Sequence, residues 1–213
     1  MRDDGAMSTP ASRHRLVYIR HGETEWSRAG RHTGNTDVPL TETGEEQARA
    51  LRPVLDGLEL VSPTVWVSPR NRAARTAELA GLTVTAVEPD LAEWDYGDYE
   101  GLTSAEIREK NPGWTVWPAG APGGESMEQV RTRVDRLLGR VVDAMVGGDV
   151  VLVAHGHLGR VLTARILGCE PAFGQHLMIL PASAAVFAHD RDGVPQLTRF
   201  GLTGYASAHY TGR

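Results

Sequence analysis

Apolar residues fall in short runs along the chain, and each run ends at a polar or glycine-containing segment. Short apolar runs bounded by turn signals are typical of strands buried on both faces of a sheet. We therefore predict strands at residues 16–19, 65–67, 84–87, 150–154, 184–187 and 197–200.

Between these runs, apolar residues recur at helical spacing and follow recognisable start signals. Thr43 and Glu46 have the spacing of a capping box, as do Ser126 and Gln129, so a helix is predicted to start at each pair. Ser68-Pro69 supplies an N-cap and first residue for another helix, which ends at Gly81. A fourth helix is predicted at residues 158–167, and residues 111–124, rich in Gly, Pro and Trp, are predicted to be a loop.

The alternation of strands and helices predicts an α/β fold of three layers, α/β/α, with a mostly parallel central sheet. In such sheets ligands bind beyond the carboxyl ends of the strands. Arg20-His21 and His155-Gly156 each directly follow a predicted strand, so both should open into that crevice. Residues 16–203 are predicted to form a single domain, residues 1–15 a disordered lead-in, and residues 204–213 a mobile tail.

Composition narrows the choice of partners. The 213 residues carry a formal net charge of -5, so no overall positive field favours nucleic acid or an anionic membrane surface. No apolar run approaches the roughly 18 residues of a membrane span, and residues 1–15 lack the apolar segment of a secretory signal. The single cysteine, Cys169, excludes an internal disulfide and fits a reducing compartment. We therefore predict a cytoplasmic protein without nucleic-acid or membrane partners, in which local cations hold any anionic substrate.

Phosphoryl transfer without a metal needs a nucleophile, cations around the phosphoryl oxygens and an acid for the leaving oxygen. Neutral imidazole is nucleophilic near pH 7, and arginine matches phosphate oxygens with its planar fork. The chain offers these groups at predicted strand and helix ends, although each taken singly could be merely structural. They are Arg20, His21, Arg72, Glu93 and His155.

His155 and His157 could instead bind a metal ion, because their spacing would let them share one. No carboxylate or thiolate cluster accompanies them and neighbouring arginines would repel a cation, so we predict no metal. The chain also lacks the phosphate-loop and dinucleotide motifs, and we predict no cofactor.

Several blocks of sequence, taken together in this order, carry a family resemblance. They are residues 20–26, 31–37, 68–77, 93–101, 124–126 and 154–156. The chain thereby resembles the histidine phosphatase superfamily, which includes the cofactor-dependent phosphoglycerate mutases, over residues 16–165. The resemblance implies a phosphoglycerate mutase-like fold.

The resemblance also implies roles for individual residues. His21 corresponds to the nucleophile that becomes a phosphohistidine, and Glu93 to the proton donor that later activates water. Arg20, Arg72 and His155 correspond to the rest of the phosphate pocket. Thr33 and Gly34 correspond to a loop whose backbone amide approaches the phosphate. Further substrate contacts are implied for Ser27, Tyr96, Gly156 and His157.

The blocks at residues 24–27, 93–102 and 114–120 look like a phosphatase branch containing actinobacterial acid phosphatases and fungal sedoheptulose-1,7-bisphosphatases. Mutases usually carry asparagine at Ser27, lysine at Ser104 and paired arginines in a longer segment after Glu93. We therefore predict hydrolysis of a small phosphorylated metabolite, either a sugar phosphate or bisphosphate or a broad range of esters. The alternatives are a mutase and a non-catalytic phosphate-binding regulatory module.

Two further expectations concern the substrate and the assembly. The shortage of lysines and the neutral loop at residues 111–124 suggest that the substrate beyond its phosphate carries little charge. The sequence leaves open a homodimer as the assembly.

Overall fold

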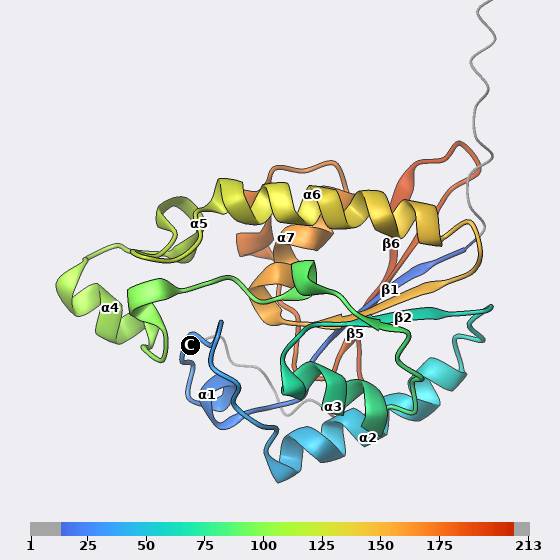
Figure 1. Ribbon diagram of the computed structural model, residues 1–213, viewed down its shortest axis with the longest axis horizontal. Coiled ribbons are helices and arrows are strands. Elements are labelled where there is room, and N and C mark those ends of the chain that lie inside the picture. Colours follow the sequence, from blue (N-terminus) through green and yellow to red (C-terminus); the bar gives the residue numbers. More distant parts are fainter. Residues whose placement is uncertain (1–13, 207–213) are drawn as a thin grey trace, which may run out of the picture.

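The structure, a computed structural model, describes residues 14–206 of the chain. The predicted lead-in and tail fall mostly on residues 1–13 and 207–213, which lie outside the described residues. A six-stranded sheet runs through the centre in the order β3-β2-β4-β1-β5-β6 (Figure 1). Its strands are Leu16–Arg20 (β1), Thr64–Val67 (β2), Ala86–Val87 (β3), Val150–Ala154 (β4), Ala184–His189 (β5) and Pro195–Leu202 (β6).

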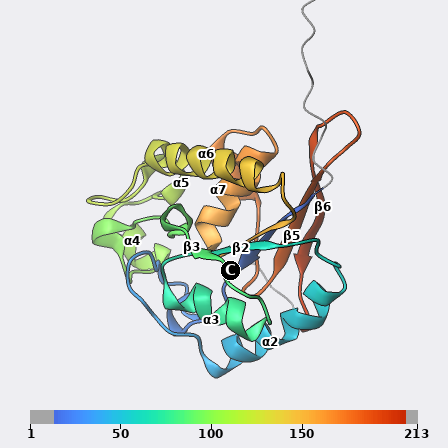
Figure 2. The same ribbon diagram turned by 45° about the vertical axis from the view of Figure 1, so that its right-hand side comes forward.

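Helices cover both faces of this sheet. α2 and α3 pack together below it in Figure 1, and α6 and α7 pack together above it, an arrangement that Figure 2 shows again from another side. The α-helices are Glu25–Arg28 (α1), Glu42–Asp56 (α2), Asn71–Leu79 (α3), Ser104–Lys110 (α4), Val116–Ala119 (α5), Met127–Ala144 (α6) and Gly156–Ile166 (α7). Short 3₁₀ helices are Pro89–Leu91 (η1), Gly97–Tyr99 (η2) and Pro171–His176 (η3).

Side chains of the central strands alternate between two hydrophobic cores. On β1, Leu16 and Tyr18 pack into the core beneath α6 and α7, whereas Val17 and Ile19 pack into the core beneath α2 and α3. Successive residues of a strand point to opposite faces, so a sheet covered on both faces requires continuous apolar runs. The predicted three-layer fold is confirmed.

The sheet is parallel from β3 to β1 and antiparallel beyond it. β2 pairs with β3 and β4, and β4 pairs with β1, all in parallel, while β5 runs antiparallel to β1 and to β6. The prediction of a mostly parallel sheet is therefore confirmed. The carboxyl ends of β1, β4 and β2 lie next to one another at one edge.

The start of α6 agrees with its prediction and the start of α2 does not. Ser126 and Gln129 form the predicted capping box, in which each side chain accepts the other residue's amide at 3.3 and 2.8 Å. The capping box predicted at Thr43 is wrong, because α2 begins at Glu42 and the Thr41 hydroxyl accepts the amide of Gly44 at 3.0 Å.

Two further element predictions need correction. Ser68-Pro69 does not cap α3, which begins at Asn71 after an N-cap, Arg70, whose side chain makes no capping bond. The Ser68 hydroxyl bonds to His155 instead. The predicted loop at residues 111–124 contains one helical turn, α5, and the short helix α4 before it was not predicted.

Residues just outside the predicted domain limits of 16 and 203 also contact the rest of the structure. Arg15, placed in the lead-in, pairs with the buried carboxylate of Asp149 at 2.7 Å and donates to the carbonyl of Leu58 at 2.7 Å. Tyr205, placed in the tail, donates to the carbonyl of Pro181 and packs against the core under α2 and α3. Within residues 14–206, none of the helices combines the length and apolar character needed to cross a bilayer.

Candidate active site

Three neighbouring parallel strands end together and place polar side chains at one edge of the sheet. His21 follows β1, His155 follows β4 and Ser68 follows β2. The in-register pair Arg20 and Ala154 holds the first two together, and the His21 amide donates to Ala154 at 2.9 Å. The rings of His21 and His155 lie edge to face with centroids 5.2 Å apart. The predicted meeting of these two segments in one crevice is confirmed.

His21 is held as a neutral imidazole with one free ring nitrogen. Its Nδ1 lies 2.7 Å from the carbonyl oxygen of Gly22, and because a carbonyl only accepts, Nδ1 carries the proton. Burial lowers the pKa of His21 well below 6.5, and the charges of Arg72 and Arg20 lower it further. Nε2 therefore keeps its lone pair at neutral pH.

His155 is fixed on both its backbone and its ring. The Tyr18 hydroxyl accepts its amide at 2.9 Å and donates to its carbonyl at 2.6 Å. Nε2 of the ring lies 2.6 Å from the Ser68 hydroxyl, whereas Nδ1 is buried without a hydrogen-bond partner among the described residues. Burial lowers the pKa of His155, and a second positive charge beside His21 and Arg72 is also disfavoured.

Two arginines beside these histidines keep one buried donor each unpaired. Nη1 of Arg20 donates to the carbonyl of Ile179 at 2.7 Å, and Nη1 of Arg72 donates to the carbonyl of Thr36 at 2.8 Å. The Nε atom of each guanidinium is buried without a hydrogen-bond partner among residues 14–206. A buried donor without an acceptor costs about 1–3 kcal/mol. These two donors lie beside His21 together with Nδ1 of His155, and an anion placed there would accept from both guanidinium groups.

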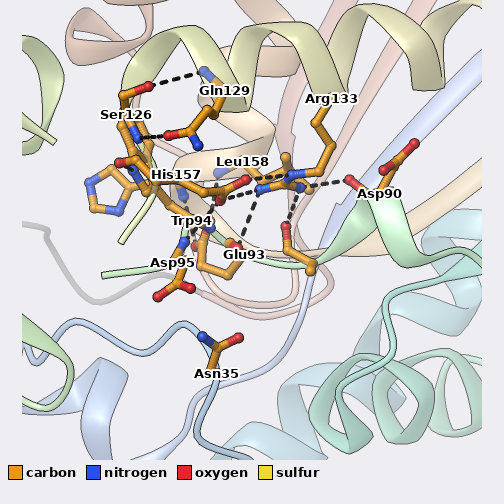
Figure 3. Close-up of polar contacts among 12 residues, drawn as sticks. Asn35, Asp90, Glu93, Trp94, Asp95, Ser126, Gln129, Arg133, His157 and Leu158 are labelled. Atoms are coloured by element: carbon orange, nitrogen blue, oxygen red, sulfur yellow. Dashed lines mark hydrogen bonds and ion pairs between the residues drawn. The ribbon is translucent and has the colours of Figure 1, made fainter. Parts of the chain in front are cut away.

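Glu93 approaches the site from η1 and sits at the amino terminus of α7 (Figure 3). Oε1 accepts the amides of Trp94 at 2.9 Å and Leu158 at 2.7 Å, while Oε2 accepts only the amide of His157 at 3.0 Å. The free amides of a helix start favour a carboxylate there. Oε2, with one bond fewer, is the oxygen that can form a further hydrogen bond.

A cavity of about 470 Å³ connects these groups to solvent. It is lined by most of the residues that the sequence implicates, namely Arg20, His21, Ser27, Thr33, Glu93, Tyr96, Gly156 and His157. Arg72 and His155 are 1% and 0% exposed and lie buried beside His21. The structure thus brings together the predicted nucleophile, acid and cations.

The loop of Thr33 and Gly34 is bonded to Glu100 and Arg72. The amide of Gly34 donates to both carboxylate oxygens of Glu100, at 3.0 and 2.9 Å. The carbonyls of Thr33 and Gly34 accept from Nη2 of Arg72 at 3.1 and 3.2 Å. The loop thus orients the arginine through its carbonyls, and its amide contact with phosphate stays a prediction.

The far wall of the cavity is a cluster of histidine and aromatic rings. The Tyr96 hydroxyl lies 2.6 Å from Nδ1 of His157, and His32 packs against Tyr96 with centroids 4.7 Å apart. Nε2 of His32 lies 3.2 Å from the Ser104 hydroxyl. Burial lowers the pKa of His32 to about 4 and that of His157 well below 6.5. These rings are neutral at pH 7.

Sequence reasoning missed several lining residues. Arg31, His32 and Arg160 line the cavity, as does the apolar segment 177–181. Arg160 could have been found, because it lies three residues after His157 on α7 and so shares its face. The segment 177–181 carries no reactive side chain, so nothing in its sequence indicated that it lines the cavity. Within residues 14–206, no group of three or more His, Cys, Asp or Glu is arranged to hold a metal.

Comparison with known proteins gives a consistent result. The profile of the Histidine phosphatase superfamily (branch 1) matches residues 16–203. An acid phosphatase of Mycobacterium tuberculosis is 47% identical over 192 residues, which cover 90% of this chain and 94% of that protein. The sedoheptulose 1,7-bisphosphatase of Saccharomyces cerevisiae is 33% identical over 184 residues, covering 73% of this chain and 68% of that protein. A solved structure of the M. tuberculosis open reading frame Rv3214 matches with a TM-score of 0.87 and 47% identity, covering 90% of this chain and 99% of that one.

Proposed function

The chain belongs to branch 1 of the histidine phosphatase superfamily, and we propose that it hydrolyses phosphate monoesters of small metabolites through a phosphohistidine on His21. The observation that carries this proposal is the neutral His21, whose Nδ1 donates to the Gly22 carbonyl and whose surroundings hold three buried nitrogens that have no hydrogen-bond partner among the described residues, two of them guanidinium donors. Relatives named acid phosphatase and sugar bisphosphatase support the same reaction class.

In the first step, Nε2 of His21 attacks phosphorus and the bond from phosphorus to the leaving oxygen breaks. Arg20, Arg72 and His155 donate to the non-bridging oxygens, on which charge is spread during transfer. Protonated Glu93 gives its proton to the leaving oxygen, which departs as an alcohol.

In the second step, the Glu93 carboxylate takes a proton from water, and the oxygen of that water attacks phosphorus. The bond to Nε2 breaks, which returns neutral His21 and protonated Glu93 and releases inorganic phosphate. The net change is one water consumed for each ester cleaved.

The substrate class can be narrowed from the charges in the cavity. Arg31 and Arg160 line it in addition to Arg20, and Glu93 is the one carboxylate among its described lining residues. The sequence suggested a substrate with little charge beyond its phosphate, but this lining favours a leaving group that carries a second anionic group. A sugar bisphosphate has that chemistry. Ser104, which stands where mutases usually carry lysine, also lines the cavity and favours hydrolysis over mutase activity.

One variant and one trapping experiment test the mechanism. His21→Ala should lower phosphate release by at least ~10³-fold, and brief reaction of the wild type should leave one acid-labile phosphoryl group on His21, found by mass spectrometry of the digested protein. Retained turnover in His21→Ala would remove the nucleophile assignment.

A substrate panel with chelator present tests the class. We expect kcat/KM for sugar bisphosphates to exceed that for the matching monophosphates and to fall more steeply with added salt. Equal values would point to a broad acid phosphatase, and conversion of phosphoglycerates that depends on a bisphosphoglycerate primer would instead establish a mutase. Phosphate binding without hydrolysis would indicate a regulatory module. The homodimer and the cytoplasmic location stay predictions.

A further inference from the structure

A charged pair lies behind Glu93, outside the lining of the cavity. Arg133 on α6 donates through Nε and Nη2 to the two carboxylate oxygens of Glu125, at 2.9 and 2.7 Å. The side chains are only 11% and 22% exposed. A two-bond contact of this kind fixes the orientation of both planar groups.

Arg133 holds the backbone that leads into Glu93. Its Nη1 donates to the carbonyls of Asp90 and Ala92, both at 2.8 Å, and Nη2 lies 3.4 Å from the carbonyl of Glu93 itself (Figure 3). One guanidinium therefore lies against three carbonyl groups within residues 90–93, the segment that ends at Glu93.

Glu125 binds the residues that directly follow Glu93. Its Oε2 accepts the amide of Asp95 at 3.0 Å, its amide donates to the Asp95 carbonyl at 2.9 Å, and its carbonyl accepts Nε1 of Trp94 at 2.8 Å. The segment on both sides of Glu93 is thus bonded to one neutralised pair, which fixes geometry without adding net charge.

We propose that Arg133 and Glu125 are positioning residues for Glu93, which set where its carboxyl group meets the leaving oxygen. This inference rests on the acid–base role proposed for Glu93. Anchoring of the turn alone does not require the pair, because Arg136 and Arg140 already bind the Asp90 carboxylate from the same helix, at 2.6 and 2.7 Å. A buried ion pair also contributes little net stability after its desolvation, whereas a fully bonded one favours a single arrangement.

The test compares substrates that differ in how much they need an acid. A nitrophenolate leaves without protonation, whereas a sugar or glycerol alkoxide needs it. The comparison uses kcat/KM, which covers the steps up to release of the alcohol and excludes the hydrolysis of the phosphohistidine that both substrates share. Glu93→Gln should lower kcat/KM for the alkyl phosphate by ~10²-fold or more and for p-nitrophenyl phosphate much less. Arg133→Lys keeps the charge but loses the fork, and should lower kcat/KM for the alkyl phosphate by ~10-fold or more, with p-nitrophenyl phosphate within about threefold.

Two further variants sharpen the result. Glu125→Gln should show the same preference for the alkyl phosphate and serves if Arg133→Lys does not fold, as judged by circular dichroism. Arg131→Met on the same helix, which loses surface pairs with Glu128 and Asp135, is the control and should match the wild type on both substrates. The double variant Glu93→Gln/Arg133→Lys should lose no more on the alkyl phosphate than Glu93→Gln alone.

The possible failures are distinguishable. The positioning role would be overturned if folded Arg133→Lys and Glu125→Gln lost kcat/KM equally for both substrates, or lost none, while Glu93→Gln still lost more for the alkyl phosphate. If Glu93→Gln itself lowered kcat/KM equally for both substrates, the acid role would fail, and the inference with it.

Discussion

At the scale of single residues, Ser68 illustrates how one hydroxyl sets the state of a neighbour. Its Oγ accepts the amide of Arg70 at 3.3 Å and lies 2.6 Å from Nε2 of His155. A hydroxyl can donate its one proton to Nε2 while it accepts the amide. In that arrangement His155 is protonated on Nδ1, the buried nitrogen that has no hydrogen-bond partner among the described residues.

We expect Ser68→Ala to lower kcat/KM by ~10–100-fold, the value of one charge-assisted hydrogen bond, because His155 no longer presents Nδ1–H to the phosphoryl group. The melting temperature should change little. Ser68→Thr keeps the hydroxyl and should recover most of the activity. An alanine variant as active as the wild type would show that the tautomer of His155 does not matter.

The activity should extend into the acid range. The pKa of His21 is lowered well below 6.5, by burial and then by Arg72 and Arg20, so the nucleophile stays neutral at pH values at which a free histidine is protonated. After correction for substrate ionisation, the acid limb of kcat/KM should lie below pH 6.5, since this limb reports groups of the free enzyme. An acid limb at pH 6.5 or above would contradict a neutral, cation-flanked His21.

At the scale of elements, the sequence predicted strands and long helices well and helix starts less well. β4 is recognisable because it is a short, continuous apolar run, buried at every position. α6 is recognisable because its buried residues recur with the period of a helix. Start signals compete: Thr41 and Thr43 both have the right chemistry, and only packing selects Thr41. Ser68 could not cap α3 because its hydroxyl bonds to His155, a contact between residues 87 positions apart.

The contact of α7 with β1 gives a prediction at this scale. A Cβ on Gly159 would lie 2.3 Å from the ring of Tyr18, the residue that holds the backbone of His155. Gly159→Ala should therefore lower the free energy of unfolding by about 1–3 kcal/mol and reduce kcat. Urea unfolding measures the first and phosphate release the second.

The matched control is Gly139→Ala in the middle of α6, where a Cβ would meet nothing within 4 Å. Alanine there should raise the free energy of unfolding by about 0.5–1 kcal/mol, because glycine is the poorer helix former. If both substitutions shifted stability in the same direction, the close approach of α7 to Tyr18 would not be the cause.

At the scale of the whole molecule, the site is partly local and partly a product of the tertiary fold. His21 and His155 were predictable because each directly follows a strand and parallel strands align their carboxyl ends. Arg31 and the segment 177–181 were not, because they reach the cavity through long-range contacts, such as the bond from Arg20 to Ile179. The pair of Arg133 and Glu125 also joins Glu93 only in the folded chain.

Buried neutral histidines also couple the stability of the whole protein to pH. His32 has a pKa of about 4 when folded and 6.5 as its ordinary value, so between these values the unfolded chain binds more protons. The free energy of unfolding therefore falls as pH falls, by about 2 kcal/mol between pH 7 and pH 5 from His32 alone. His21, His155 and His157, whose pKa values are also lowered by burial, act in the same direction.

Replacing His32 by glutamine should remove its share of this loss. We expect urea unfolding at pH 7 and pH 5 to show a decrease in the wild type that exceeds the decrease in His32→Gln by about 2 kcal/mol, even if the variant is less stable at pH 7. Parallel decreases would mean that the imidazole is protonated in the folded protein. In that case the wall of His32, Tyr96 and His157 would carry positive charge in the same pH range in which His21 stays neutral, and it would bind the second anionic group of a substrate directly.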